Sequence, residues 1–139
     1  MVSEAIKQAE ARAGIEHITI IKNIPDTLVV PGDESKLRGT IINLVNNAID
    51  VLHDRQIVNG VISISAKVEG KEATLNITDN GPGIPPEIIE TLFEPFVTRG
   101  KRNGTGLGLS IVKQFIIGHG GKIAVYNNNG ATFTITLPL

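Results

Sequence analysis

Apolar residues recur along the chain with two periodicities, which predict alternating helices and strands. Between Asp33 and Arg55 they recur every three or four residues and form one stripe, which predicts a long helix capped by Asp33. Residues 4–13 are rich in Ala, Glu, Lys and Gln and predict a shorter helix, closed by Gly14 at its C-terminal cap. The stripe consists of Leu37, Ile41, Leu44, Val45, Ala48, Ile49 and Leu52.

Alternation of apolar and polar residues predicts the strands. Residues 61–68 and 73–78 alternate and are separated by a four-residue connection, so they predict a central β-hairpin. Residues 18–22 and 27–30 are β-branched runs on either side of a turn sequence, which predicts a short antiparallel pair. Two further strands are predicted at the C-terminal end, at residues 122–127 and 132–137.

Two helices are predicted between the central hairpin and the last strands. Pro85 and Pro86 begin a short helix that ends near Phe93, because proline is tolerated in a first helical turn. A second helix, over residues 109–117, ends at the glycines of residues 118–121. The order of elements predicts an α/β two-layer sandwich, with a mostly antiparallel mixed sheet covered on one face by three helices.

Composition limits the classes of function. The chain has 139 residues, of which 41% are hydrophobic, enough for one compact domain with a real core. A formal charge of -1 gives no overall field for nucleic acid, and 4% aromatic residues offer little surface for base stacking. The chain contains no cysteine, so it cannot form a thiolate metal site. It also contains no run of about 18 apolar residues, which is the length needed to span a bilayer. Any binding of phosphate would therefore depend on a few groups at one site and not on the net charge of the chain.

Asn43 and Asn47 are the first candidate site residues. They stand four residues apart in the long predicted helix and therefore share a face, whereas Asn46 does not. Two carboxamides beside an apolar stripe are costly to bury without partners. Because an amide oxygen is a suitable ligand for Mg²⁺ that is held mainly by phosphates and water, a metal role stands beside that of a solvated polar face.

A second candidate is the segment 79–83, which directly follows a predicted central strand. Asp-Asn-Gly-Pro-Gly is ordinary turn chemistry. It also suits base recognition, because the Asp79 carboxylate can accept a hydrogen bond from an exocyclic amino group such as that of adenine. Gly81 and Gly83 would let the backbone approach the ring closely.

A third candidate lies where the last predicted helix begins. Gly104, Gly106 and Gly108 alternate with Thr105 and Leu107, which leaves backbone amides bare at a helix N-terminus and favours an anion. The segment is neither a P-loop, since it lacks Gly-Lys-Ser/Thr, nor a dinucleotide fingerprint, since no strand precedes it. Phosphate is the expected anion.

The three segments, in this order and each at the boundary of a predicted element, match one family pattern that extends over nearly the whole chain. The chain resembles the catalytic ATP-binding domain of sensor histidine kinases, within the superfamily of gyrase-type ATPases, heat-shock chaperones and mismatch-repair ATPases. The resemblance implies a Bergerat-type ATP-binding fold and four boxes, named N, G1, F and G2. They correspond to residues 43–48, 79–83, 92–96 and 104–108.

The resemblance also implies roles for individual residues. Asn47 would ligate Mg²⁺, Asp79 would hold the adenine amino group, and Asn43 would support the phosphate side of ATP. The backbone of the G2 box, at Thr105, Gly106, Leu107 and Gly108, would hold the phosphates, and Gly81 and Gly83 would line the base.

A cationic segment precedes the G2 box. Residues 97–103 lack apolar periodicity and carry Arg99, Lys101 and Arg102, so a mobile surface loop is expected. Relatives commonly place a cation that reaches the phosphates in such a lid. Lys101 is the favoured one of the three.

Asn43 distinguishes phosphoryl transfer from hydrolysis. In the gyrase and chaperone branches the corresponding residue is a glutamate that activates water, and an amide cannot act as a general base. In-line transfer to an external nucleophile needs mainly positioning and charge neutralisation, so a protein-histidine kinase is favoured. The alternatives are a nucleotide-binding regulatory module without catalysis and a serine-directed protein kinase of the same fold.

The phosphoacceptor histidine is not expected within this chain. His53 lacks the sequence context of a phosphoacceptor box and is interpreted as the solvated end of the long helix, and His17 and His119 are expected to be structural. Residues 1–14 are interpreted as the tail of a connection to a separate dimerisation and phosphoacceptor domain, and residues 15–139 as the catalytic domain. The expected partners are that domain and a response regulator, in the cytoplasm, with a monomeric isolated domain and a homodimeric parent kinase.

The sequence departs from the family at one position beside the predicted base site. Relatives often carry a hydroxyl directly after the glycine that precedes the last strand, where this chain has Ala131. Thr132 could substitute only if the turn shifted by one residue. The alternating pattern of the strand gives no support for such a shift, so Thr132 is not included in the site.

Overall fold

The computed structural model describes residues 2–25, 28, 34–94, 108–127 and 129–139. None of the helices within these ranges combines the length and the apolar character needed to cross a bilayer. In chain order the elements are α1 (Val2–Ile15), β1 (Thr19–Asn23), α2 (Glu34–Asp54), β2 (Val61–Glu69), β3 (Glu72–Asp79), α3 (Pro86–Ile89), α4 (Gly108–Gly118), β4 (Lys122–Asn127) and β5 (Ala131–Pro138).

The five strands form one mixed sheet in the order β1-β2-β3-β5-β4. The pairs β2–β3, β3–β5 and β5–β4 are antiparallel, which confirms the mostly antiparallel sheet. β1 pairs with β2 in parallel, with Thr19 opposite Val61, a pairing that local sequence patterns did not predict. The antiparallel partner expected for β1, at residues 27–30, lies outside the described residues except for Leu28.

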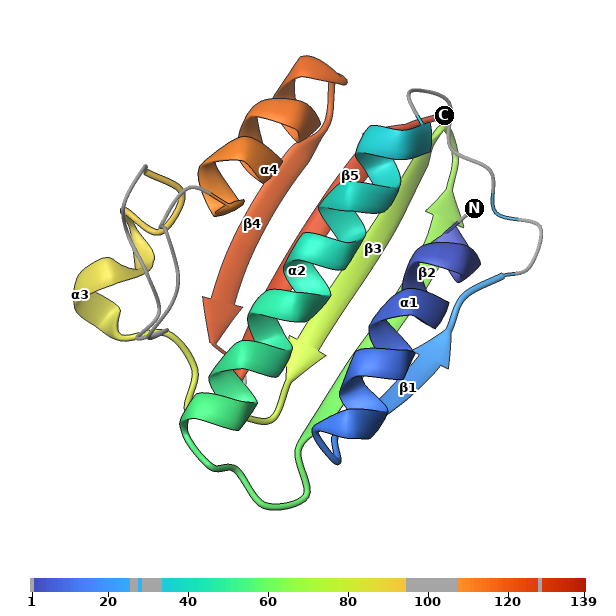
Figure 1. Cartoon of the computed structure of the whole chain (residues 1–139). Coiled ribbons are helices and arrows are strands. Elements are labelled where there is room, and N and C mark those ends of the chain that lie inside the picture. Colours follow the sequence, from blue (N-terminus) through green and yellow to red (C-terminus); the bar gives the residue numbers. More distant parts are fainter. Residues whose placement is uncertain (1, 26–27, 29–33, 95–107, 128) are drawn as a thin grey trace.

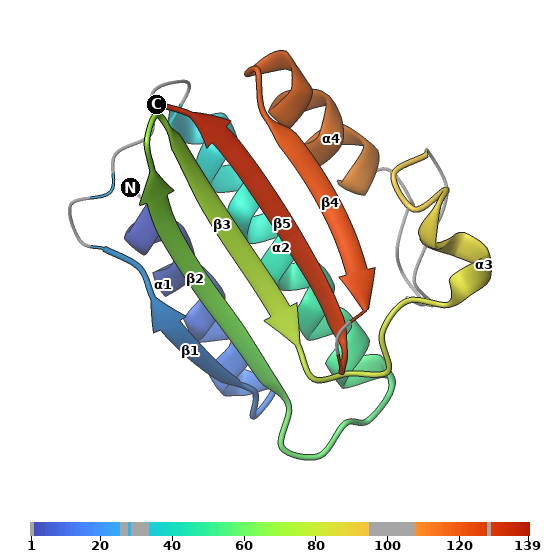
Figure 2. The ribbon, with the colours of Figure 1, turned by 180° about the vertical axis from the view of Figure 1, so that it is seen from behind.

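Three helices, α1, α2 and α4, lie over one face of the sheet, as Figure 1 shows. Seen from behind, the strands stand in front of these helices, and the short α3 lies to the side of the sheet (Figure 2). The two-layer sandwich with helices on one face is therefore confirmed, but the third covering helix is α1, largely within the segment interpreted as a connecting tail, and not the short helix after Pro86. The core of the sandwich lies between the layers and includes Leu44 and Ile49 of α2, Ile64 of β2, Ile77 of β3 and Ile135 of β5.

α1 ends two residues later than the sequence predicts. The expectation that Gly14 closes this helix is wrong, because α1 continues through Ile15 and His17 adopts the left-handed conformation, with φ 58°. The N–H of Ile18 donates to the carbonyl of Ala13, which is the long hydrogen bond of a Schellman cap. Ala13 and Ile18 are both buried, so packing fixes where the helix ends.

α1 is tied to α2 by apolar and polar contacts. Ile6 is fully buried in the same core cluster as the stripe of α2. Nη1 of Arg12 donates to Oδ1 of Asn46 at 3.1 Å, and Nη2 of Arg12 pairs with the carboxylate of Asp50. The first helix therefore packs directly beside the segment that the sequence identifies as the N box.

α3 is shorter than predicted. The expected end near Phe93 is wrong, since the helix ends at Ile89 and residues 90–93 form turns. The N–H of Glu94 donates to the carbonyl of Thr91 at 2.9 Å, which is a turn bond. Leu92 is fully buried, so this segment follows the surface of the core instead of continuing as a helix.

We expect Ile6→Ala to destabilise the chain by about 2–5 kcal/mol, because it leaves a cavity beneath α1. Urea denaturation followed by circular dichroism measures the change. Ile15→Ala in the same helix is the matched control, because Ile15 is 77% exposed and Ile6 is 0% exposed. Equal effects of the two substitutions would contradict the packing of α1 into the core.

Candidate functional site

One face of α2 carries the two asparagines singled out in the sequence. Asn43, Asn47 and Val51 stand at intervals of four residues and so share this face. Nδ2 of Asn43 lies 3.4 Å from the carbonyl oxygen of Gly108, the first residue of α4. A Cβ on Gly108 would lie 2.9 Å from Oδ1 of Asn43, so a larger residue there would displace the Asn43 side chain. The N-terminus of α4 therefore meets α2 at Asn43.

Gly81 meets the same helix further along. A Cβ on Gly81 would lie 3.2 Å from Leu52, 3.7 Å from Val51 and 3.1 Å from Oδ1 of Asp79. Asn43 and Val51 are separated by about 12 Å along the helix axis, at 1.5 Å per residue. The predicted phosphate end and the predicted base end of the site thus lie two turns apart on one helix.

Asn47 lies between these two ends. Its side chain is 2% exposed, and its Nδ2 atom has no hydrogen-bond partner among the described residues. A buried amide group without a partner costs free energy, so the site suits a ligand that would supply one. Because the oxygen and nitrogen of a carboxamide exchange places by a half-turn, this group can face either an anion or a cation.

Asp79 is the last residue of β3 and is 3% exposed. Alternation along the strand places it on the same face as Ile77, which is the face that the helices cover. Its Oδ1 accepts hydrogen bonds from the N–H of Gly81 at 3.0 Å and from the N–H of Ala131 at 3.3 Å. The carboxylate is thereby fixed at the end of the sheet, beside α2.

Two asparagines that the sequence analysis did not select hold the segment that follows Asp79. Oδ1 of Asn80 accepts from the N–H of Val61 at 2.8 Å, and its Nδ2 donates to the carbonyl of Asn59 at 3.1 Å. Asn127 binds both backbone groups of Ile84. No sequence pattern could have found these contacts, because asparagine at a strand end is also ordinary turn chemistry.

Gly83 and Gly130 allow the close backbone approaches around Asp79. Gly83 has φ 81°, and a Cβ there would lie 2.8 Å from Oδ1 of Asn127. Gly130 has φ 132°, and its Cβ would lie 1.8 Å from the carbonyl oxygen of Asp79. Gly130, which the sequence analysis did not include in the site, is therefore required for β5 to pass this strand end.

The register of β5 keeps Thr132 away from Asp79. Thr132 stands opposite Thr78, and the two hydroxyl oxygens lie 3.1 Å apart on the sheet face that the described helices do not cover. Ala131 lies beside Asp79 on the covered face, so the turn is not shifted by one residue. In this register Thr132 faces away from the Asp79 carboxylate, and the membership of Thr132 in the site stays as the sequence predicts.

Several predicted site residues lie outside the described part of the chain. They are Lys101, Thr105, Gly106 and Leu107, together with Arg99 and Arg102 of the predicted lid. Of the G2 box, only Gly108 is described. The site that the structure brings together consists of Asn43, Asn47, Asp79, Gly81, Gly83 and Gly108.

The described part of the F box packs onto the core near α4. The ring of Phe93 meets that of Phe133 edge to face, with 6.2 Å between their centroids. Nζ of Lys113, in α4, lies 5.6 Å from the centroid of the Phe93 ring. Residue 93 is thereby anchored to both β5 and α4.

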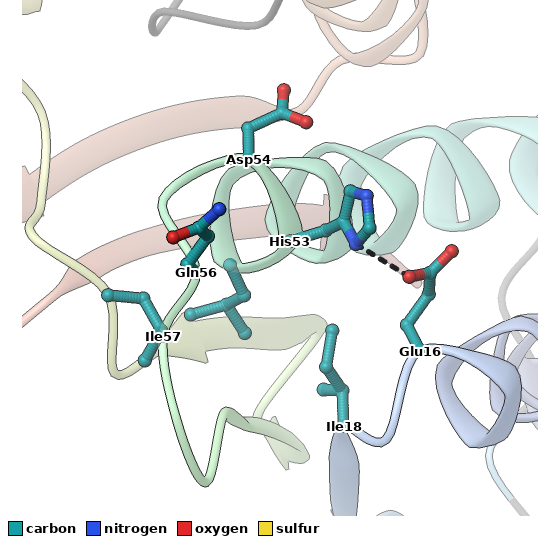
Figure 3. Close-up of a pocket in the computed structure, with 7 residues that line it drawn as sticks. Glu16, Ile18, His53, Asp54, Gln56 and Ile57 are labelled. Atoms are coloured by element: carbon teal, nitrogen blue, oxygen red, sulfur yellow. Dashed lines mark ion pairs between the residues drawn. The ribbon is translucent and has the colours of Figure 1, made fainter.

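One hollow borders this site at Asn43, and another lies away from it. A groove of about 530 Å³ between α2 and α4 is lined by Thr40, Asn43 and Phe115 among others. A pocket of about 360 Å³ lies where α1 and α2 end, and Figure 3 shows His53 and Glu16 facing each other there. Nδ1 of His53 lies 2.7 Å from Oε2 of Glu16. The His53 side chain is 60% exposed, as expected for the solvated end of the long helix.

Taken together, a carboxylate at one end, two amides along a helix and a glycine-led helix N-terminus at the other end define an ATP-binding domain of the two-layer α/β class. The chain belongs to the family of histidine kinase-, DNA gyrase B- and HSP90-like ATPases, whose pattern matches residues 32–139. ATP is the nucleotide of this family. The match contains every box described above.

Relatives of this chain include bacterial sensor kinases. The chain is 41% identical over 128 residues to the sensory histidine kinase/phosphatase NtrB of Vibrio alginolyticus, covering 84% of this chain and 35% of NtrB. It spans about a third of the length of the curated relatives that it matches first.

Solved structures share the fold. The mycobacterial sensor histidine kinase MprB superposes with a TM-score of 0.86 at 28% identity, covering 99% of this chain and 92% of that one. Histidine kinase ThkA, in complex with the response regulator protein TrrA, superposes with a TM-score of 0.78 at 30% identity, covering 98% of this chain and 40% of that one.

We expect Gly83→Ala to lower the free energy of unfolding by about 1 kcal/mol or more, because alanine disfavours positive φ and its methyl group would strike Asn127. Thermal and urea denaturation measure the loss. Gly39→Ala in α2 is the control, since a Cβ there meets nothing within 4 Å, and it should stabilise the chain by about 0.5–1 kcal/mol. A neutral Gly83→Ala would contradict the geometry of this turn.

Proposed function

We propose that this chain is the catalytic domain of a sensor histidine kinase, which transfers the γ-phosphoryl group of ATP to a histidine on a separate dimerisation domain. The observation that carries the proposal is the contact of Asn43 with Gly108, which sets an amide, not a carboxylate, beside the expected phosphate end. An amide cannot deprotonate water, so this position favours transfer over hydrolysis.

In this proposal the ends of the site bind different parts of ATP. The Asp79 carboxylate accepts a hydrogen bond from the adenine amino group, with the backbone of Gly81 and Gly83 beside the base. The bare amides of the G2 box, which include Gly108 and, in sequence, Thr105, Gly106 and Leu107, hold the phosphates. Lys101 supplies the positive charge of the lid near the phosphates. Transfer then depends on alignment and charge neutralisation.

Mg²⁺ is assigned to Asn47. The buried carboxamide lies between the two ends of the site, and no described residue binds its Nδ2, so the amide is free to turn its oxygen toward an ion. Mg²⁺ accepts an amide oxygen as one ligand when phosphates and water supply the others. When bound, the ion would neutralise phosphate charge during transfer.

The partners follow from the same assignment. Residues 1–14 lead, in this proposal, to the dimerisation and phosphoacceptor domain of the parent kinase, and residues 15–139 carry catalysis. A response regulator is the second partner, supported by the complex of the ThkA neighbour with its regulator. The domain acts in the cytoplasm, where ATP is available. Alone it is monomeric, whereas the parent kinase is a homodimer.

The test is phosphotransfer from γ-labelled ATP to the histidine-containing domain of the parent protein. We expect acid-labile phosphohistidine on that domain, and almost no free phosphate from the isolated chain. An acceptor domain in which the histidine is replaced by glutamine is the control and should remain unlabelled.

Other results of the same assay would each point elsewhere. ATP binding without transfer would identify a regulatory nucleotide-binding module. Acid-stable label would identify a serine-directed kinase, and steady phosphate release would identify a hydrolase.

We expect Asn47→Asp to change the Mg²⁺ dependence of ATP binding, because a carboxylate repels the phosphates until a cation lies between them. Calorimetric titrations of ATP at several Mg²⁺ concentrations measure this dependence. At low Mg²⁺ the Asn47→Asp variant should bind ATP more weakly than the wild-type chain. Asn46→Asp is the matched control, since Asn46 faces Arg12 and should leave the Mg²⁺ dependence unchanged. The same dependence in both variants would remove Asn47 from the metal site.

A further inference from the structure

The side chain of Asn127 binds one residue at two points. Asn127 is the last residue of β4, and its Oδ1 accepts the N–H of Ile84 at 2.8 Å. Its Nδ2 donates to the carbonyl oxygen of Ile84 at 3.0 Å. One carboxamide thus satisfies both backbone groups of a single residue, as a neighbouring strand would do. The contact joins parts of the chain that are 43 residues apart.

Ile84 directly follows the G1 box. The side chain of Ile84 is buried in the core. The preceding residue, Gly83, has no Cβ, and the carboxamide of Asn127 lies close to where a Cβ would be. On the opposite side, Asn80 binds the backbone at Val61 and Asn59. The segment that contains Gly81 and Gly83 is therefore held by an asparagine at each end.

We propose that Asn127 is a positioning residue for the base end of the nucleotide site, an inference that rests on the proposed function. It acts through Ile84: the two hydrogen bonds fix the backbone of Gly81 and Gly83, and with it the space beside the Asp79 carboxylate. A turn held in its binding geometry before the ligand arrives loses less conformational entropy on binding, which raises affinity. Asn127 itself does not need to touch the nucleotide.

The location of Asn127 makes the inference specific. Gly108 and Asn43 form the phosphate end of the site two helical turns away, so loss of the Asn127 contacts should affect the base and leave phosphate contacts intact. Adenosine, ADP and ATP share the base and differ in phosphates. A change at the base end should therefore weaken all three by the same factor.

The experiment measures the dissociation constants of adenosine, ADP and ATP for the wild-type chain, Asn127→Ala and Asn127→Asp. We expect Asn127→Ala to weaken all three by about tenfold, as two lost hydrogen bonds of modest net strength would do. Asn127→Asp keeps the shape and one acceptor but sets a carboxylate oxygen against the carbonyl of Ile84, so it should weaken binding at least as much as Asn127→Ala. Thermal melting establishes that each variant is folded at the temperature of the assay.

Asn76→Ala is the matched control. Asn76 lies in β3 on the uncovered face, where it accepts a hydrogen bond from Thr134 at 2.7 Å. The substitution removes an asparagine hydrogen bond from the same sheet, away from the G1 box, and should leave all three affinities unchanged. Unchanged affinity in Asn127→Ala, equal losses in Asn76→Ala, or a loss confined to ATP would each overturn the positioning role. Failure of the wild-type chain to bind any nucleotide would instead count against the proposed function.

Discussion

The burial of the Asp79 carboxylate is the constraint on which the site depends. Removing a carboxylate from water is expensive unless hydrogen bonds compensate for the lost solvation. Here the N–H groups of Gly81 and Ala131 supply compensation, and they come from segments that are far apart in the chain. The ends of β3 and β5 must therefore stay together, and glycine is needed wherever the backbone passes this close.

α2 relates this constraint to the rest of the molecule. Its apolar stripe packs on the sheet through residues such as Leu44 and Ile49, which fixes the rotation of the helix about its axis. The same rotation directs Asn43 toward the start of α4 and buries Asn47 between the two ends of the site. Core packing and site geometry are thus set by one helix, and α1 is fastened to it through Arg12.

Local sequence patterns predicted the elements whose signals are local. The apolar stripe of α2 and the alternation along β2, β3 and β5 were sufficient to locate these elements. The candidate site residues could then be placed at the ends of these strands and helices. Parallel pairing of β1 with β2 could not be predicted, since it joins segments on either side of α2. The predicted end of α1 was wrong because burial of Ala13 and Ile18 outweighed the preference of glycine, here Gly14, for the C-terminal cap position. Asn127 was missed because its partner is a backbone distant in sequence.

The one-sided helical layer divides the sheet into two faces with different tolerance for evolutionary change. On the covered face, residues such as Ile77 and Ile135 are enclosed, so most replacements would create cavities or clashes. On the other face, Ser63 of β2 and Thr134 of β5 alternate with the buried residues of their strands, and no helix of the described part lies over this side of the sheet. Substitutions there are usually close to neutral for stability. Relatives with the same nucleotide site can therefore differ widely along alternate positions of each strand and still keep one fold.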